Sequence, residues 1–310
     1  MTTNNRSLSY PPLSGLPPNF VAENVKLVCC DIDGTTLDPS NTITPYTLST
    51  FRAVRALRPD LPIIFATGRP RIATRQINAA MEELGHTMGV YSNGALCGAE
   101  DADTPSGHHA PSFRTIHECP IPADDVLWYL NFSVTNNRPM VLYTYDRILS
   151  PVDHPSFAVT QEADEPYPEK TPVEELIKSV KEGLVIHKLS FMSPKPSLDA
   201  TRLDLEKSPT RPPATILVRT GDPRLEIMNV GATKAAAIAE LAKNVIKCSM
   251  DQVMAFGDGA NDMEMLSECG MGVAMGNGSE EVKSVGKFVA PGNGEDGLAR
   301  VLRAVFGIDP

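Results

Sequence analysis

Short apolar runs alternate with amphipathic stretches along the first third of the chain. The apolar runs predict three buried strands, at residues 26–33, 62–68 and 89–94. Two helices are expected between them, one over residues 45–57 with Thr44 as its N-cap and one over residues 71–84. Strands and helices in this order predict a doubly wound parallel sheet, so the expected fold class is α/β with a Rossmann-like core.

The pattern becomes less regular beyond residue 94. Prolines are frequent between residues 95 and 228, and polar loops separate the expected elements. The candidate elements are strands at 140–145, 185–192, 216–219 and 225–228 and helices at 124–134, 173–181 and 198–207. We interpret this segment as a second α/β domain that is inserted into the first.

The alternation of strands and helices resumes near residue 231. The pattern there predicts a helix at 234–243, a strand at 253–257, a short helix that ends at 268, and strands at 272–275 and 288–290. A chain of 310 residues is long enough for two domains. We therefore expect a core built from residues 25–94 and 229–310, with residues 95–228 as the inserted domain.

Residues 1–24 are expected to form a flexible N-terminal tail. The segment contains prolines at positions 11, 12, 17 and 18 and lacks the hydrophobic centre of a secretory signal. Arg6 and the serines and asparagines around it leave an organellar targeting segment open as an alternative.

Composition and charge narrow the function classes. The net charge is −10 and no cluster of Lys and Arg occurs, which argues against nucleic acid as a partner. No apolar stretch approaches the ~20 residues that cross a bilayer, so no membrane partner is expected. The six cysteines include no C-x-x-C pair and are expected to be reduced thiols, which favours a cytoplasmic protein. The sequence does not indicate an oligomeric state.

Three of the expected core strands end in residues that carry chemistry. Asp31 and Asp33 end the first strand, Thr67 ends the second, and Asp258 follows the strand at 253–257. In an open parallel sheet, ligands bind outside the carboxyl ends of the strands. These distant segments are therefore expected to converge on one site.

Asp31 and Asp33 lie two residues apart on an extended chain, so their side chains share a face. Two carboxylates this close are unfavourable without a cation, and hard oxygen ligands suit Mg²⁺. One carboxylate can attack phosphorus while the other protonates the leaving oxygen. Taken alone, the pair is also compatible with surface acids or with a calcium-binding loop.

Two further positions are candidate phosphate ligands. Thr67 and Gly68 follow an apolar strand, where a hydroxyl and exposed backbone N–H groups suit a phosphate oxygen; an ordinary helix N-cap is the alternative. Lys234 begins a predicted helix, where its charge opposes the helix dipole; a solvated lysine is the alternative. The pair His108-His109 could bind a metal, but exposed loop histidines are the simpler interpretation.

Residues 257–262, with the sequence GDGAND, are the most specific local signal. Two glycines flank Asp258 directly after a strand, and Asn261 and Asp262 follow. The segment is not the dinucleotide-binding fingerprint, because Asp262 stands where the third glycine belongs.

Together these segments resemble the motifs of the haloacid dehalogenase-like hydrolases, and specifically of the Cof-type phosphatases. The family's first motif, D-x-D-G-T, is similar to residues 31–35, and its second and third motifs match Thr67 and Lys234. The Cof-type fourth motif, G-D-G-x-N-D-x-x-M, matches residues 257–265. The subgroup's S-N-G-A and A-M-G-N segments correspond to residues 92–95 and 274–277. Thr36 and Ala235 depart from residues that are common in the family, although neither is a proposed catalytic group.

The resemblance implies a role for each matched residue. Asp31 would be the nucleophile, and Asp33 would be the general acid and then the general base. The phosphate would be held by Thr67, Gly68, Lys234 and Asn261. The Mg²⁺ site would be formed by Asp31, the backbone carbonyl of Asp33, Asp258 and Asp262. Residues 95–228 would form a cap over the site.

The sequence thus predicts an enzyme, a phosphoric monoester hydrolase that uses Mg²⁺ and a phospho-aspartate. Its partner would be a small phosphorylated metabolite, such as a sugar phosphate. A sugar phosphomutase of the same superfamily is one alternative. A non-catalytic sugar-phosphate-binding protein is another, although such a protein would be expected to have lost motif residues. A dehalogenase would lack the second acid, which is Asp33 here.

Overall fold

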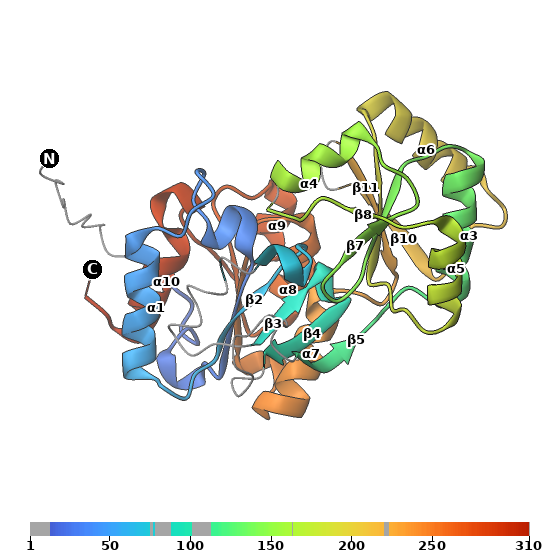
Figure 1. Ribbon diagram of the computed structural model, residues 1–310. Coiled ribbons are helices and arrows are strands. Elements are labelled where there is room, and N and C mark those ends of the chain that lie inside the picture. The colour runs from blue at the N-terminus through green and yellow to red at the C-terminus, as the bar shows by residue number, and fades with distance from the viewer. Residues whose placement is uncertain are drawn as a thin grey trace, which may run out of the picture.

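Two β-sheets organise the chain, one in each of the two lobes that stand side by side in Figure 1. The computed structural model describes residues 13–74, 77, 88–100, 113–162, 164–219 and 223–309, and the structural statements below refer to these residues. The larger sheet has eight strands in the order β14-β13-β12-β1-β2-β3-β4-β5. The smaller sheet has six strands in the order β10-β11-β9-β6-β7-β8.

The larger sheet is parallel from β14 to β3 and antiparallel from β3 through β5. Its strands are β1 Leu27–Cys30, β2 Ile63–Ala66, β3 Met88–Tyr91, β4 Leu96–Glu100, β5 Phe113–Glu118, β12 Val253–Gly257, β13 Met271–Ala274 and β14 Phe288–Val289. The central strands β1, β2 and β12 are buried along their whole length, as their unbroken apolar sequences predict. The expected parallel α/β core is confirmed.

Helices cover both faces of the larger sheet. They are α1 Pro45–Leu57, α7 Lys234–Leu241, α8 Met263–Glu268, α9 Glu280–Val285 and α10 Gly297–Phe306. Helices α1 and α10 pack in one apolar cluster with one face of the sheet, and α7 and α8 pack in a second cluster with the other face. Thr44 caps α1 as expected, because its Oγ1 accepts a hydrogen bond from the backbone N–H of Thr47 at 3.0 Å.

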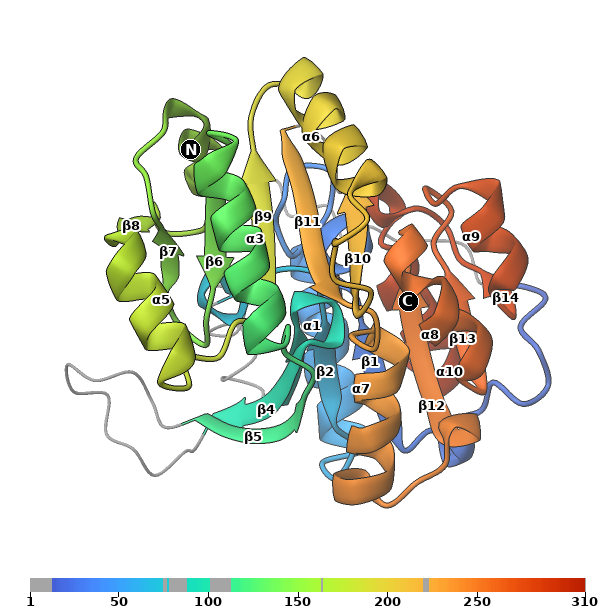
Figure 2. The same cartoon turned by 90° about the vertical axis from the view of Figure 1, so that its right-hand side faces the viewer.

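The smaller sheet has helices on its outer face. Its strands are β6 Met140–Tyr143, β7 Ile148–Ser150, β8 Glu169–Lys170, β9 Lys188–Met192, β10 Thr215–Arg219 and β11 Arg224–Asn229. The outer helices are α3 Ala123–Thr135, α5 Val173–Lys181 and α6 Lys195–Lys207, which lie in front of the sheet in Figure 2. The short helix α4 Val159–Glu162 lies on the side of the larger lobe (Figure 1).

The face of the smaller sheet under the outer helices is apolar, whereas the opposite face combines a small apolar cluster that includes Val141 and Tyr143 with buried charged residues. Leu189 and Phe191 of β9 and Leu225 and Ile227 of β11 belong to the apolar cluster under the outer helices. Because side chains alternate along a strand, Lys188 and Glu226 point to the opposite face, toward the larger lobe.

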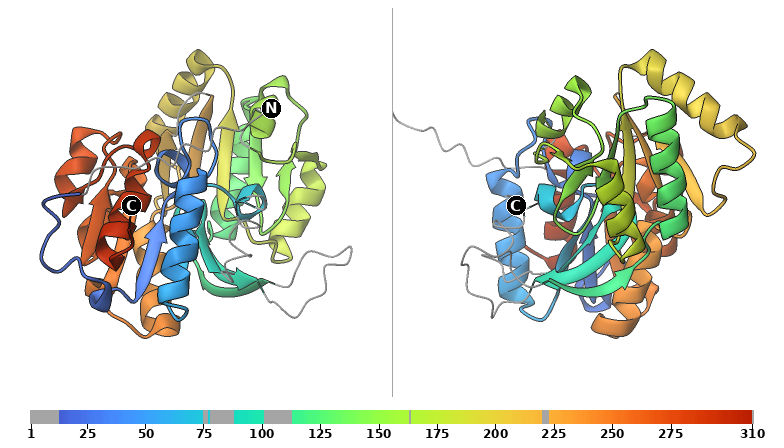
Figure 3. Two further views of the ribbon diagram at one scale, coloured as in Figure 1. Left: turned by 90° about the vertical axis from the view of Figure 1, so that its left-hand side faces the viewer. Right: turned by 45° about the vertical axis from the view of Figure 1, so that its right-hand side comes forward.

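The inserted segment begins later than the sequence analysis placed it. Strands β4 and β5 pair within the larger sheet and continue it beneath the smaller lobe (Figure 3), although both were expected to belong to residues 95–228. The backbone N–H of Cys119 still bonds to Ala95 O, at 2.9 Å, whereas that of Ile121 bonds to Ile186 O, at 2.9 Å, in the smaller lobe. The chain therefore crosses between the lobes at residues 119–121.

One other expectation needs correction. Residues 13–24 do not form a loose tail: Phe20 is 4% exposed and joins the core cluster of α1 and α10, and Asn19 Nδ2 donates to Gly270 O at 3.2 Å. Leu13 and Leu16, which lie between the prolines, also pack against this cluster. The helix expected from residue 71 begins as a single 3₁₀ turn, Arg71–Thr74. Of its remaining residues only Ile77 is described, so the expected helix over 71–84 stays a prediction. Residues 1–12 and the pair His108-His109 also lie outside the described part of the chain.

Candidate active site

The carboxyl ends of β12, β1 and β2 lie next to one another at one edge of the larger sheet. In the register of these parallel strands, Cys30 pairs with Phe256 on one side and with Phe65 on the other. Asp31 and Thr67 therefore leave neighbouring strands at the same edge, and Asp258 follows the third. The convergence that the sequence predicts for these segments is thus observed.

Lys234, at the start of α7, is a buried ammonium between two carboxylates. Its Nζ donates to Asp31 Oδ1 at 2.6 Å and to Asp262 Oδ1 at 2.6 Å, and the residue is 1% exposed. Burial favours the neutral amine, but Asp262 and Asp31 outweigh this effect and raise the pKa of Lys234. These two acids explain a lysine placed against the helix dipole, so Lys234 is not a solvated lysine.

Three carboxylates gather around the end of β1. Asp31, Asp258 and Asp262 each offer an oxygen, and these oxygens lie within 4.8 Å of one another. Burial raises the pKa of Asp31 well above its usual range. The nearby Lys234 lowers this pKa and Asp262 raises it by a smaller amount, but burial is the largest effect. Burial and the charge of Asp262 also raise the pKa of Asp258. Such crowding of buried carboxylates favours a bound cation, and the hard oxygen donors suit Mg²⁺.

Two distant segments, residues 31–35 and residues 274–277, hold the side chain of Asp258 in place. Thr35 Oγ1 donates to Asp258 Oδ1 at 3.2 Å, and Asn277 Nδ2 donates to Asp258 Oδ2 at 3.0 Å and to Gly34 O at 2.8 Å. Gly34 has a φ of +76°, and a Cβ at this position would overlap Asp258 Oδ2. Asn277 was part of a motif without a role in the sequence analysis. Its contacts now show that it joins two loops of the site.

Asp262 supports the loop after β12. The side chain is fully buried, and its Oδ2 accepts hydrogen bonds from the backbone N–H groups of Asp258, at 3.1 Å, and Gly259, at 2.9 Å. Its other oxygen accepts from Lys234. Both oxygens therefore have protein partners, and a direct metal bond from Asp262 stays a prediction.

The expected phosphate ligands Thr67, Gly68 and Asn261 lie around the loop after β3. Thr67 is fully buried, and its Oγ1 accepts from the backbone N–H of Arg69 at 3.0 Å. Asn261 Nδ2 donates to Asn93 Oδ1 at 2.8 Å, and the same oxygen lies close to Gly68. Asn93 has a φ of +55°, an uncommon conformation for a residue with a side chain. Asn93 thus links the second and fourth motifs, a role that the sequence analysis did not assign.

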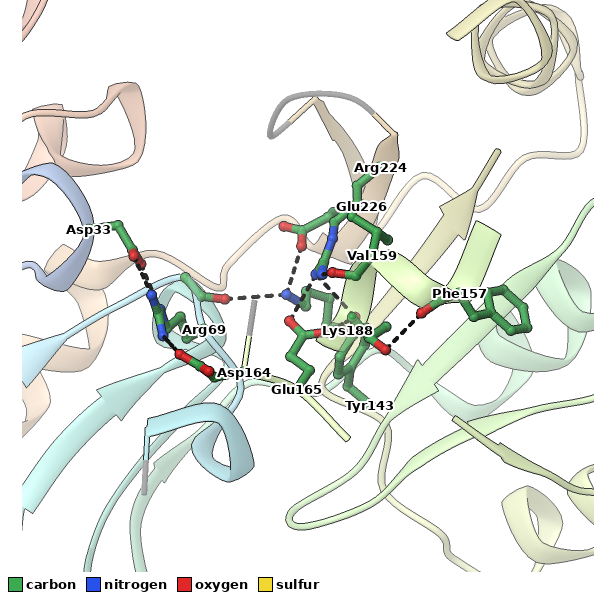
Figure 4. Close-up of polar contacts among 12 residues, drawn as sticks. Asp33, Arg69, Tyr143, Phe157, Val159, Asp164, Glu165, Lys188, Arg224 and Glu226 are labelled. Carbon is green, nitrogen blue, oxygen red and sulfur yellow. Dashed lines mark hydrogen bonds and ion pairs between the residues drawn. The ribbon is translucent and has the colours of Figure 1, made fainter. Parts of the chain in front are cut away.

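Asp33 lies apart from the carboxylate cluster, on the more exposed side of the site. Its side chain is 51% exposed, and Arg69 binds both of its oxygens: Nε to Oδ2 at 2.9 Å and Nη2 to Oδ1 at 2.6 Å (Figure 4). The hydrogen bonds to Asp33 raise the pKa of Arg69. The sequence analysis missed this contact, although a cation two residues after Thr67 could have signalled it.

The chain matches the family model of haloacid dehalogenase-like hydrolases over residues 28–302. This match covers most of the chain, and the chain therefore belongs to that family, as the motifs predicted. The expected enzyme class, a hydrolase, is also confirmed.

Three similar proteins illustrate the relationship. Endoribonuclease YBEY, chloroplastic, of Arabidopsis thaliana is 26% identical over 285 residues, which cover 89% of this chain but only 45% of that protein. Phosphatase YwpJ of Bacillus subtilis is 25% identical over 303 residues, covering 90% of this chain and 99% of the relative. The crystal structure of a haloacid dehalogenase-like hydrolase from Bacteroides thetaiotaomicron is 22% identical, with a TM-score of 0.75, over 91% of this chain and 100% of that one.

The three similar proteins support different conclusions. The last of the three supports the fold, including its two lobes. The chain spans less than half of the Arabidopsis protein, so that protein's activity is not carried over to it. Within the described residues, none of the helices has both the length and the apolar character needed to cross a membrane.

Proposed function

We propose that the chain is a Mg²⁺-dependent phosphatase that hydrolyses a small phosphorylated metabolite through a phospho-aspartate on Asp31. The observation that carries this proposal is the buried contact of Lys234 with Asp31 and Asp262, next to the carboxylate of Asp258. A nucleophilic carboxylate, a lysine and a further acid at the ends of parallel strands suit phosphoryl transfer, which depends mainly on positioning and charge neutralisation. The relative named phosphatase YwpJ, which matches over most of both chains, supports the same function.

Asp31, Asp258 and the backbone carbonyl of Asp33 would bind the Mg²⁺, with Asp262 as a further ligand or as the support of the loop. The fit rests on hard oxygen donors and on acids whose pKa values burial raises. A bound Mg²⁺ would neutralise part of the charge of the phosphate and of the carboxylates. A Ca²⁺ ion, which prefers more ligands at longer distances, fits the proposed chemistry less well.

The protein residues would divide the reaction between them. Asp31 would attack phosphorus, because its carboxylate lies at the end of β1 where the phosphate is expected. Lys234, Thr67, Gly68 and Asn261 would hold the phosphate oxygens. Asp33 would give a proton to the leaving alcohol and then take one from the water that hydrolyses the phospho-aspartate.

We propose a sugar phosphate or a similar phosphomonoester as the substrate, and a cytoplasmic location. The acidic chain, with a net charge of −10, suits a small substrate bound in a metal site better than a polyanion. All six cysteines are unpaired in the structure, which supports a reducing compartment. The smaller lobe would act as a cap that contacts the leaving group.

The proposal is tested with the purified protein, Mg²⁺ and a panel of phosphorylated metabolites, with released phosphate and products measured. We expect free phosphate from at least one phosphomonoester, and an acid-stable but hydroxylamine-sensitive phosphoenzyme after rapid quenching. Asp31→Asn should form neither, because the amide is a poor nucleophile. A substantial fraction of wild-type phosphate release by this variant excludes the phospho-aspartate. An isomerised phosphate ester in place of free phosphate identifies a phosphomutase.

A further inference from the structure

Among the contacts between the smaller lobe and the candidate active site, two fall on adjacent residues, Gly68 and Arg69. Lys188 Nζ, on β9, donates to Gly68 O at 3.2 Å. Asp164, on the loop after α4, places its Oδ2 3.7 Å from Arg69 Nη1. Figure 4 shows Arg69 between Asp33 and Asp164, with Lys188 near Glu226 and Tyr143 on the smaller sheet. Two cap residues thus reach one short segment of the core.

Lys188 is a fixed point on the cap. Its side chain is only 2% exposed, and its Nζ donates to Glu226 Oε1, on β11, at 2.7 Å. The same ammonium lies 4.6 Å from the centre of the Tyr143 ring, on β6. A buried lysine held by two neighbouring groups of the cap has little freedom, so its bond to Gly68 O depends on the position of the cap.

Asp164 is also held by buried neighbours, although its own side chain is 62% exposed. The next residue, Glu165, accepts from Arg224 Nη1 at 2.8 Å and from the Tyr143 hydroxyl at 2.9 Å. The side chain of Glu165 is 3% exposed. This buried network fixes the loop and presents Asp164 to Arg69, as Figure 4 shows.

On the core side, the same segment continues to Asp33. Arg69 binds both oxygens of Asp33, and its backbone N–H donates to Thr67 Oγ1 at 3.0 Å. A two-point contact between a guanidinium and a carboxylate fixes the orientation of both groups. The orientation of Asp33 therefore depends on Arg69, and the position of Arg69 is set jointly by the core and the cap.

We propose that Lys188 and Asp164 are positioning residues, which fix Arg69 when the cap docks and thereby orient Asp33 for proton transfer. The inference rests on the proposed function, in which Asp33 is the general acid. It adds a second role for the cap. Besides contacting the substrate, the docked cap is required for protonation of the leaving group. Substrates whose leaving group needs a proton should therefore be more sensitive to cap docking than activated esters.

The test compares two substrates in each variant. The first is p-nitrophenyl phosphate, whose leaving group hardly needs a proton, and the second is the best alkyl phosphate of the metabolite panel. We expect Asp164→Asn to lower the ratio of alkyl to aryl turnover several-fold. The matched control is Glu169→Gln, which removes another cap carboxylate, 52% exposed and paired with Arg147, away from Gly68 and Arg69. This control should leave the ratio unchanged.

Lys188 needs a variant that can fold, because Lys188→Met alone would leave Glu226 buried and unpaired. The double variant Lys188→Met/Glu226→Met replaces the pair with apolar side chains, a change that buried ion pairs often tolerate. We expect the alkyl-to-aryl ratio to fall by roughly tenfold to a hundredfold, the cost of a misplaced catalytic group. Faster hydrogen exchange at the Arg69 amide should accompany it, since that N–H is bonded to Thr67.

Combining Lys188→Met/Glu226→Met with Asp33→Asn tests whether the fall in the alkyl-to-aryl ratio depends on Asp33. In that background the Lys188/Glu226 replacement should lower the ratio no further, because both changes act on the same step. An equal fall in both backgrounds overturns the inference, as does an equal loss on both substrates. If the wild-type protein hydrolyses both substrates and none of the cap variants changes the ratio, only this inference fails. If the wild-type protein hydrolyses no phosphomonoester, the proposed function fails, and this inference with it.

Discussion

Lys234 Nζ lies 2.6 Å from Asp31 Oδ1, although 203 residues of sequence separate the two. The contact joins the strand that precedes the inserted lobe to the helix that follows it. The chain leaves the larger lobe after β5 and returns to it before α7, yet the end of β1 and the start of α7 are in direct contact. The large insertion is therefore compatible with a rigid site in the larger lobe. The proposed nucleophile consequently has a fixed, buried counter-ion that does not belong to the cap.

The first prediction is that this lysine is needed for stability. Lys234→Met would leave Asp31 and Asp262 as neighbouring buried carboxylates with no ammonium between them. Removal of one partner from a buried pair costs about 3–5 kcal/mol, so the free energy of unfolding in urea without added metal should fall by about that amount. Lys243→Met, an exposed position beyond the same helix, should stay within about 0.5 kcal/mol of wild type. Equal stability of the two variants contradicts the structural role of Lys234.

Much of the site could be predicted from local sequence. The apolar runs of β1, β2 and β12 are uninterrupted, and each is followed at once by polar motif residues. Since such strands are buried on both faces, their parallel arrangement follows, and the motif residues share one edge of the sheet. The positions of Asp31 and Asp258 therefore required no long-range information beyond strand order.

The contact between Arg69 and Asp33 and the contacts between the lobes could not be predicted in this way. Arg69 and Asp33 are 36 residues apart, and Lys188 and Gly68 are 120 apart, so neither pair leaves a periodic signal. Strands β4 and β5 were missed because their pairing is set by the edge of β3, not by their own weak pattern. The positions of Lys188 in β9 and Glu226 in β11 could be read from the sequence. That these two residues face the larger lobe follows only from the arrangement of the two lobes.

The second prediction concerns metal binding, measured without turnover. Mg²⁺ should raise the melting temperature of the wild-type protein, since a ligand at 100 times its Kd stabilises the folded state by about 2.7 kcal/mol. NaCl at the same ionic strength should not reproduce the rise. Asp258→Asn removes one of the three clustered carboxylates and should abolish most of it. A rise that is unchanged in Asp258→Asn places the cation elsewhere.

The third prediction concerns pH and the crossing between the lobes. His187 Nε2 lies 2.8 Å from Glu118 Oε1, an oxygen that also accepts from the Tyr145 hydroxyl. Burial lowers the pKa of His187 below its ordinary value of 6.5, despite the opposing effect of Glu118. The unfolded chain therefore binds a proton more readily, and stability is lost as the pH falls below that ordinary value.

The lowered pKa of His187 predicts a measurable difference in acid sensitivity between the wild-type protein and a variant without this histidine. Between about pH 7.5 and about pH 5, the wild-type free energy of unfolding should fall more than that of His187→Gln, which carries no titrating ring. Urea titrations at both pH values, with the same salt, measure the difference. A fall of the same size in the two proteins shows that other groups cause the acid sensitivity.

The last prediction separates backbone strain from the geometry of the site. Gly34 and Gly15 have nearly equal φ angles, +76° and +79°, so alanine at either position meets the same left-handed penalty of about 1–2 kcal/mol. The surroundings differ, because a Cβ on Gly34 would overlap Asp258 Oδ2, whereas nothing lies within 4 Å of a Cβ on Gly15. Gly34→Ala should therefore lose more stability than Gly15→Ala. It should also lose the Mg²⁺-dependent rise in melting temperature, which Gly15→Ala should keep. The two variants need only urea unfolding and melting curves with and without Mg²⁺. If both respond alike, the close approach of Gly34 to Asp258 does not shape the proposed metal site, and backbone conformation alone accounts for the glycine.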